Sequence, residues 1–327
     1  MFLANPILVE VTRGDLVESV HRGSIAIADA GGVIRFALGD VESAVYPRSS
    51  LKPIQALPLI ESGAAEAFGL SDEEVALACA SHSGEPMHTA RVAAWLARIG
   101  CGEEDLACGP QPPRYEPALE AMIRSGEKPT RLHNNCSGKH TGFLTVARHW
   151  QVATKGYERI DHPVQQAVVT SLRALSGVCE LPFGIDGCTA PNFALPLAGF
   201  ARALAQLAGR RTVGAGRILR AMIAHPELVA GTGRAGTVLM RAACGRAALK
   251  VGAEGVFAGM IPETGLGIAL KIDDGAGRAA ETAIAAILVK LGVIGEARDF
   301  IAAPVLDTRG NAVGVRRPAS ALETAAI

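Results

Sequence analysis

The sequence has 327 residues and balanced charge, with 32 Lys and Arg against 32 Asp and Glu, and 49% of its residues are hydrophobic. A formal net charge of zero predicts no binding to nucleic acid or to an anionic membrane surface, because both require a basic field. The length can bury a large core, and we interpret 1–327 as a single domain that leaves room for a helical subdomain around 52–245.

The first part of the chain predicts β structure. Segments rich in β-branched residues predict strands at 7–11, 24–28 and 33–38. Gly31 and Gly32 lie between the last two segments and predict a hairpin turn there.

The middle of the chain predicts helices. An apolar period begins after Pro47 behind a Ser49-Ser50 cap, and Pro58 should kink this first helix. Ser71 and Glu74 have the spacing of a capping box. Further helices are predicted at 88–99, 138–150, 163–175 (behind an Asp161 cap), 196–207 and 217–224.

The last third predicts strands again. Short strand candidates at 248–251, 256–260 and 268–272 precede an amphipathic helix at 279–291, and the end, 319–327, should be frayed. Strands at both ends with helices between them predict an α+β fold. In that fold the N- and C-terminal segments share a mixed sheet, and the helices pack against it as a layer.

Three features of the sequence predict the location of the protein. The first six residues have no cationic region ahead of an apolar stretch, so no secretory signal is expected. The apolar segment 284–294 is interrupted by Lys290 and Gly292, which predicts no membrane span. Seven scattered cysteines favour reduced thiols over disulfides, so we expect a cytoplasmic protein.

Ser49 and Lys52 have the spacing of a serine nucleophile and a lysine base. On a helix they project from the same face, one turn apart, so the amine would be held against the hydroxyl. The helix N-terminus would stabilise an alkoxide and disfavour an ammonium. Lys250, far downstream before Gly252, completes the pattern of enzymes that acylate a serine by means of lysine. The alternative is a capped helix with a solvated Lys52.

Two further segments carry candidate binding residues. Ser81 lies in a polar string, 79–85, and could be a second nucleophile, a hydrogen-bond donor to substrate or a helix cap. Arg234 follows a glycine-rich loop and could clamp a substrate carboxylate, although a surface position is favoured.

The string 134–140 is the most unusual in the sequence. Small residues that enter a helix form a nest of backbone N–H groups suited to a carboxylate or an oxyanion. Cys136 and Cys188 could share a metal ion with Lys139 or His140 as the third ligand. The alternative for both cysteines is buried apolar packing.

Together these strings resemble the asparaginase II family, the rhizobial-type (class 3) L-asparaginases. The matching segments follow the family order over nearly the whole chain. They are 17–23, 48–53, 79–83, 135–140, 161–163, 186–188, 225–227, 229–231 and 250–252. One departure lies near Gly236, where some members carry a cysteine and this chain does not.

The resemblance implies a fold related to serine β-lactamases and glutaminases, a homodimer, and hydrolysis of L-asparagine to L-aspartate and ammonia. It pairs Ser49 with Lys52 and Ser81 with Lys250 as the catalytic residues. It also implies a zinc site, with substrate-binding residues close by. The implied zinc ligands are Cys136, Lys139 and Cys188, and the substrate-binding candidates are Arg48, His82, Asp186 and His140.

The zinc is expected to anchor the substrate's α-amino and α-carboxylate groups, although an open fourth position would also permit metal-hydroxide chemistry. Two other functions remain as alternatives. One is a β-lactamase or transpeptidase-like serine acyl hydrolase, whose relatives normally act outside the cytoplasm. The other is an amino-acid-binding protein without turnover, which the presence of both Ser–Lys pairs disfavours.

Overall fold

An antiparallel sheet built from both ends of the chain is the centre of the fold. The computed structural model describes residues 4–210 and 212–327. The main sheet has the order β11-β12-β1-β2-β10-β9-β8, and β3 also pairs with β2. Its strands are β1 (Ile7–Arg13), β2 (Leu16–Ala28), β3 (Ile34–Leu38), β8 (Ala248–Val251), β9 (Val256–Ile261), β10 (Leu266–Ile272), β11 (Ala303–Leu306) and β12 (Ala312–Pro318).

The expected α+β fold, with a sheet shared by the two ends of the chain, is confirmed. One detail differs, because every recorded strand pair of this sheet is antiparallel, whereas a mixed sheet was expected. Neighbouring strands β9 and β10 are joined by a tight turn, as are β8 and β9, and such short connections impose antiparallel pairing.

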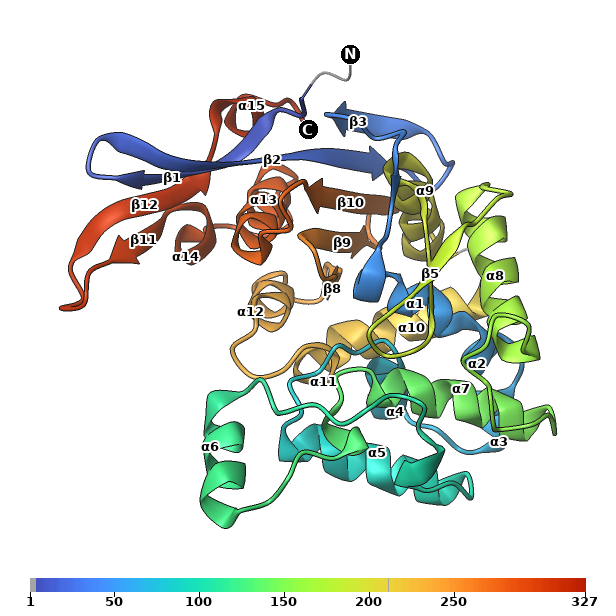
Figure 1. Cartoon of the computed structure of the whole chain (residues 1–327). Helices are drawn as coiled ribbons and strands as arrows, with labels where there is room; N and C mark the ends of the chain where they lie inside the picture. The colour runs from blue at the N-terminus through green and yellow to red at the C-terminus, as the bar shows by residue number, and fades with distance from the viewer. Residues whose placement is uncertain (1–3, 211) are drawn as a thin grey trace.

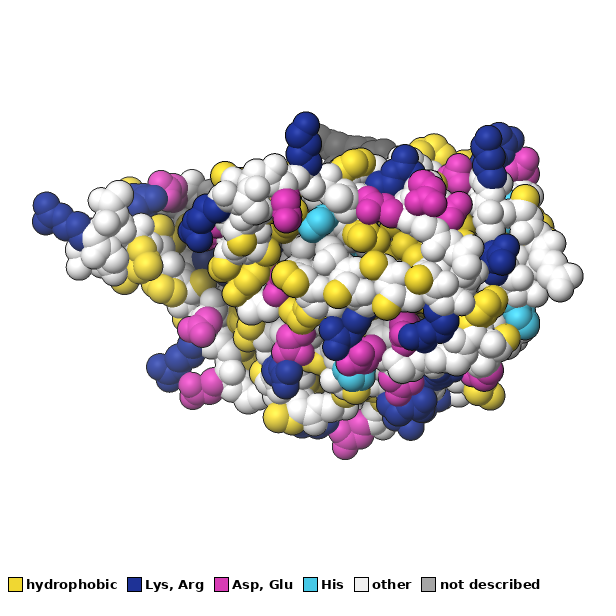
Figure 2. Space-filling model, turned by 90° about the horizontal axis from the view of Figure 1, so that it is seen from below, with side chains coloured by type: hydrophobic (Ala, Val, Ile, Leu, Met, Phe, Trp, Pro, Cys, Tyr) yellow, Lys and Arg dark blue, Asp and Glu magenta, His cyan; other side chains and the backbone are white. Residues whose placement is uncertain are grey.

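The two halves of strand β2 pair with different strands of the sheet. From Gly23 onward it is buried and pairs with β10, whereas its first half is largely exposed and pairs with β1. That first half, with β1, β11 and β12, forms an arm at the left of Figure 1. Hydrophobic side chains gather on the arm in Figure 2, and Leu16 on β2 is 77% exposed.

Helices lie beside and below the sheet (Figure 1). They are α1 (Lys52–Gln55), α2 (Leu57–Glu61), α3 (Ala64–Ala67), α4 (Asp72–Ala78), α5 (Pro86–Arg98), α6 (Glu116–Ser125), α7 (Ser137–His149), α8 (Pro163–Ser176), α9 (Leu197–Ala208), α10 (Val213–Ala224), α11 (Pro226–Val229), α12 (Ala235–Ala242), α13 (Gly277–Lys290), α14 (Arg298–Ile301) and α15 (Ser320–Glu323). Within the described ranges, none of these helices has the length and apolarity needed to cross a bilayer.

Helix α9 packs in close contact with strand β10 of the sheet. A Cβ atom at Gly267 of β10 would lie 2.1 Å from the backbone nitrogen of Ala205 on α9, so only glycine fits there. Helix α7 is buried along most of its length and packs against α2, α4, α5 and α8. These contacts join the sheet and the helices into one hydrophobic core.

The helix boundaries confirm several local predictions and correct others. Ser71 and Glu74 form the expected capping box of α4. The break at Ala56, just before Pro58, separates α1 from α2. Pro47 rather than a serine caps the turn before α1, and His162 rather than Asp161 caps α8.

The C-terminal segment is packed rather than frayed. Leu322 of α15 is fully buried, and the amide of Ala319 donates to the carbonyl of Leu8 on β1. Four remaining short strands form two small sheets near the helices. They are β4 (Ala44–Val45) with β7 (Leu195–Pro196), and β5 (Phe183–Ile185) with β6 (Pro191–Phe193).

Candidate functional site

The segment that carries Ser49 is held against the end of β8. Residues Arg48–Leu51 form a 3-10 turn that leads into α1, and Arg48 has a left-handed backbone (φ 53°). A Cβ atom at Gly252, just after β8, would lie 2.7 Å from the carbonyl oxygen of Pro47. Only glycine lets the strand approach this closely, and the approach brings Lys250 to the start of α1.

Ser81 lies between two buried lysines. Its Oγ is 3.0 Å from Nζ of Lys52 on α1 and 2.7 Å from Nζ of Lys250 on β8. All three residues are at most 4% exposed. Lys52 also donates to the carbonyls of Ala80 and Asn135, which fixes its amine at the junction of three segments.

The two lysines cannot both carry a proton at low cost. Burial lowers the pKa of Lys250 well below its ordinary value, and the charge of the neighbouring Lys52 lowers it further. Burial therefore favours the neutral amine of Lys250, which lies 2.7 Å from the Ser81 hydroxyl. A neutral amine in hydrogen-bond contact with a hydroxyl can accept its proton.

The structure does not show the expected contact between Ser49 and Lys52. In the part of the chain that the structure describes, no hydrogen bond joins their side chains, and Lys52 contacts Ser81 instead. The reason is that residues 48–51 form a 3-10 turn ahead of α1 rather than the first turn of an α-helix. Ser49 lies on the wall of a cavity of about 330 Å³.

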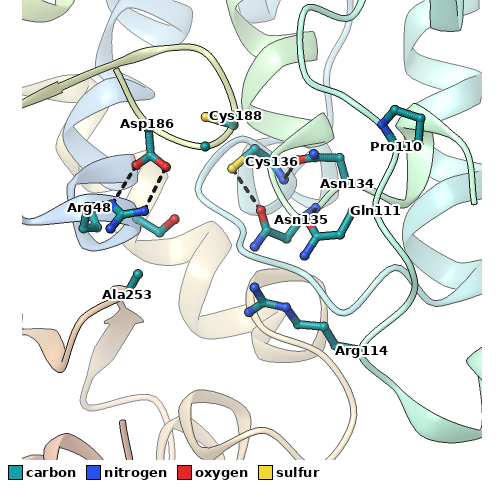
Figure 3. Close-up of a pocket in the computed structure, with 12 residues that line it drawn as sticks. Arg48, Pro110, Gln111, Arg114, Asn134, Asn135, Cys136, Asp186, Cys188 and Ala253 are labelled. Atoms are coloured by element: carbon teal, nitrogen blue, oxygen red, sulfur yellow. Dashed lines mark hydrogen bonds and ion pairs between the residues drawn. The ribbon is translucent and has the colours of Figure 1, made fainter. Parts of the chain in front are cut away.

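Figure 3 shows this cavity, and charged and polar side chains surround it. Arg48 donates to both carboxylate oxygens of Asp186, at 3.1 and 3.2 Å. Burial alone would raise the pKa of Asp186, but the hydrogen bonds and charge of Arg48 lower it overall. The cavity is lined by Arg48, Ser49, Pro110, Gln111, Arg114, Asn134, Asn135, Cys136, Asp186, Gly187, Cys188 and Ala253.

A hairpin and a helix bring the three expected metal ligands together. Cys188 lies in the turn between β5 and β6, and Cys136 and Lys139 lie at the start of α7. Nζ of Lys139 is 3.1 Å from Sγ of Cys188. The structure shows no cluster of three or more His, Cys, Asp or Glu suited to a metal among residues 4–210 and 212–327, so any metal here would need the lysine.

The two thiols differ in protonation. The neighbouring side chain of Cys136, supported by the charge of Lys139, lowers the pKa of Cys188 to about 4 against the opposing effect of burial. The side chain of Cys188, together with burial, raises the pKa of Cys136 to about 12. Burial would lower the pKa of Lys139, but Cys188 and Cys136 raise it overall. The cluster therefore pairs a thiolate and an ammonium beside a neutral thiol.

The backbone N–H groups at the start of α7, which were expected to bind a carboxylate or an oxyanion, already donate to acceptors within the protein. The amide of Asn135 donates to the side chain of Gln111, and the amide of Cys136 donates to the side chain of Asn134. The amide of Ser137 donates to the carbonyl of Asn134. These N–H groups hold the loop in shape and are not aimed at a ligand.

His82 and His140 lie behind the cavity and not on its wall. His82 is fully buried, contacts Ser137 at 2.9 Å and stacks on His88 with 4.8 Å between ring centroids. His140 contacts the hydroxyl of Tyr157 at 2.6 Å. Burial lowers the pKa of both histidines, so both are neutral and support the loops that form the site.

Sequence reasoning missed Arg114 and favoured a surface position for Arg234, which it also named as a possible carboxylate clamp. Arg114 lines the cavity from a loop whose proline content, at 110, 112 and 113, was a readable sign of a rigid loop. Arg234, favoured as a surface residue, is half-buried at the start of α12, and its charge is among those that lower the pKa of Lys250.

The chain is similar to one protein family and to several solved structures. A family model described as L-asparaginase II matches residues 9–318. A search of curated proteins gives no match.

Solved structures show a low-level similarity. Mglu in its native form is 14% identical over 90% of this chain and 71% of that chain, with a TM-score of 0.49. A putative β-lactamase from Bacteroides dorei is 13% identical over 76% of this chain and 84% of that chain, with a TM-score of 0.43. Unliganded simvastatin synthase from Aspergillus terreus is 11% identical over 79% of this chain and 90% of that chain, with a TM-score of 0.38.

Proposed function

Because the chain belongs to the L-asparaginase II family, we propose that this amide hydrolase acts on L-asparagine and releases L-aspartate and ammonia. The observation that carries the proposal is the Ser81 hydroxyl held between Lys52 and Lys250, together with Ser49, three residues before Lys52, on the wall of a cavity. This arrangement supplies a base, a proton path and a free hydroxyl, which are the parts that acyl transfer by a serine requires.

The first step activates Ser49. Neutral Lys250 accepts the proton of Ser81, and Ser81 takes a proton from Lys52 across their 3.0 Å contact. Lys52 is then a neutral amine, and it takes the proton of Ser49 as Oγ of Ser49 attacks the side-chain amide carbon. Both lysines carry a proton only while the tetrahedral oxyanion supplies a compensating negative charge. The same path run backwards delivers a proton to the leaving nitrogen, so ammonia departs and a β-aspartyl ester remains. Water then hydrolyses the ester with the same residues as base.

The oxyanion needs donors other than the loop before α7, because those amides are occupied. The backbone N–H groups of Ser49 and Ala253 both belong to residues on the cavity wall. Neither donates to a recorded acceptor within the described ranges. We assign the oxyanion to these two groups, and such preorganised donors commonly contribute several kcal/mol to transition-state stabilisation.

The residues of the Cys136–Lys139–Cys188 cluster suit a zinc ion. The observation that supports this is the thiolate of Cys188 in contact with the amine of Lys139, since zinc prefers sulfur and nitrogen ligands. When bound, zinc would supply a fixed positive charge that anchors the α-amino and α-carboxylate groups of the amino acid. Asp186, beside the cluster, could accept a hydrogen bond from the α-amino group.

The direct test is ammonia release from L-asparagine by the purified protein, with L-glutamine and the chromogenic β-lactam nitrocefin as comparison substrates. Ammonia from L-asparagine supports the proposal. Nitrocefin hydrolysis without ammonia would identify a β-lactamase-like acyl hydrolase. Tight binding of L-asparagine without turnover would identify an amino-acid-binding protein.

The rate should depend on pH through the lysine pair. The mechanism needs one neutral amine, and the lowered pKa of Lys250 favours that form. As pH falls through the apparent pKa of the pair, Lys250 gains a proton and kcat/KM should fall about tenfold per pH unit. A profile of kcat/KM for L-asparagine against pH checks this. A rate that stays constant down to about pH 5 would contradict a lysine base.

Zinc should co-purify at about one ion per chain, and the double variant Cys136→Ser, Cys188→Ser should lack it. Metal content measured by atomic emission checks this independently of activity. Affinity for zinc should fall with falling pH, since Lys139 and Cys136 must lose protons to bind it. Chelation should raise KM more than it lowers kcat, and a metal-free protein with normal KM would contradict the anchoring role.

A further inference from the structure

Arg114, on the cavity wall, and Arg234, at the start of α12, are two arginines that form no ion pair among the described residues. Among the described residues, the guanidinium groups of Arg114 and Arg234 have no recorded hydrogen bond or ion pair, in contrast to Arg48, which is paired with Asp186. Arg114 lines the cavity, and Figure 3 shows its guanidinium directed inward, below Asn135. Arg234 is half-buried at the start of α12.

The same short segment holds both arginines in place. The amide of Arg114 donates to the carbonyl of Ser83 at 2.8 Å. The loop before Arg234 is tied to the same segment, because Thr232 donates its amide and its hydroxyl to the carboxylate of Glu85. The side chain of Ser83 also donates to the carbonyl of Ala230. Since Ser81 begins this segment, both arginines are positioned relative to the serine between the lysines.

The pair is electrostatically unfavourable as it stands. Burial lowers the pKa of Arg234, and the charge of Arg114 lowers it further. The acid that partly offsets them is Glu281 on α13, which forms no recorded ion pair with Arg234 and whose own pKa is raised by burial. Two guanidinium groups that lack a carboxylate partner would be stabilised by a bound anion that carries a carboxylate.

We propose that Arg114 and Arg234 form the subsite for the α-carboxylate of the amino-acid substrate and select for substrates that carry this group. The inference rests on the proposed function. A carboxylate has two oxygens, so a guanidinium and a metal ion can share it. With the carboxylate held at Arg114, the side-chain amide of a four-carbon amino acid would extend across the cavity toward Ser49 on its wall.

The test compares two amides in the zinc-loaded protein: L-asparagine and 3-aminopropanamide, which lacks the carboxylate. In Arg114→Leu with Arg234→Leu, kcat/KM for L-asparagine should fall about 100-fold or more, mainly through KM, since each charge-assisted contact accounts for about tenfold or more. Activity on 3-aminopropanamide should change less than about threefold on the same scale. Equal losses on both substrates, or no loss on L-asparagine, would overturn the proposal.

A control variant separates recognition from structure. Arg309→Leu removes an exposed guanidinium that has no hydrogen-bond or ion-pair partner among the described residues, on the turn between β11 and β12. It should keep kcat/KM for L-asparagine. The double arginine variant should also keep or raise the melting temperature, because it removes a repulsive pair. A marked fall in melting temperature together with equal loss on both amides would show a structural role.

Binding distinguishes failure of the subsite from failure of the proposed function. L-Aspartate carries the same α-carboxylate and can be titrated calorimetrically into wild-type and variant protein. Loss of its binding in the double arginine variant supports the subsite even if wild type releases no ammonia from L-asparagine. Equal binding to both proteins, or no binding to wild type, overturns it.

Discussion

Ser49→Ala is expected to abolish ammonia release from L-asparagine, with a loss on the order of 10³- to 10⁶-fold in kcat. The change removes only one oxygen from a side chain on the cavity wall. Because the Ser49 hydroxyl has no recorded hydrogen-bond partner within residues 4–210 and 212–327, its loss should leave the melting temperature unchanged. Steady-state kinetics and thermal denaturation of the same preparation check both expectations.

The adjacent serine provides a matched control. Ser50 is fully buried and donates to the carbonyl of Pro47 at 2.5 Å, so Ser50→Ala should cost about 1 kcal/mol of stability and leave most of the activity. Activity of Ser49→Ala above about a tenth of wild type would remove Ser49 from the nucleophile role. If Ser81→Ala alone were then inactive, Ser81 would be the nucleophile.

Lys52→Arg is expected to be nearly as damaging as Lys52→Ala. Arginine keeps the positive charge but cannot become a neutral base at working pH, so the path from Ser49 to Lys250 is interrupted. Lys52 is also 1% exposed and contacts Ala80, Ser81 and Asn135, which leaves little space for a guanidinium. We expect a fall of kcat by about 100-fold or more, as is usual when a general base is lost.

A lysine outside the site provides the comparison. Lys290 donates to the carbonyls of Glu323 and Ala325 near the end of the chain, and Lys290→Arg should behave as wild type. Melting temperatures measured in parallel separate poor folding of Lys52→Arg from lost chemistry. Retention of most activity in a folded Lys52→Arg protein would show that Lys52 acts only as a charge and that Lys250 alone is the base.

Local signals in the sequence predicted the elements well. The capping box at Ser71 and Glu74 depends on residues three apart, and Pro58 acts on its own helix, so both effects can be read without the fold. Apart from β1, the strands of the arm were missed for the opposite reason. Strand β12 shows no clear alternation of buried and exposed residues, because it lies outside the main core and carries Arg316 and Arg317 side by side.

The site was predicted in its residues but not in its contacts. The spacing of Ser49 and Lys52 predicted a direct pair, yet Lys52 reaches Ser81 across 29 positions and Lys250 reaches Ser81 across 169. Such contacts depend on how β8 and α4 pack, which no local pattern encodes. Arg114 was missed, and a surface position was favoured for Arg234, for the same reason, since a guanidinium without a partner is recognisable only once its neighbours are known.

The order of strands has a consequence for synthesis of the protein on the ribosome. Strands β1 and β2 emerge first, but their outer partners in the sheet, β12 and β10, are among the last segments to be translated. At a rate of about 5–20 residues per second, the nascent hairpin waits on the order of 10–50 s with both edges unpaired. The buried half of β2 is apolar, so this interval exposes a segment prone to aggregation. We expect the nascent chain to depend on chaperone binding to that segment until β10 appears.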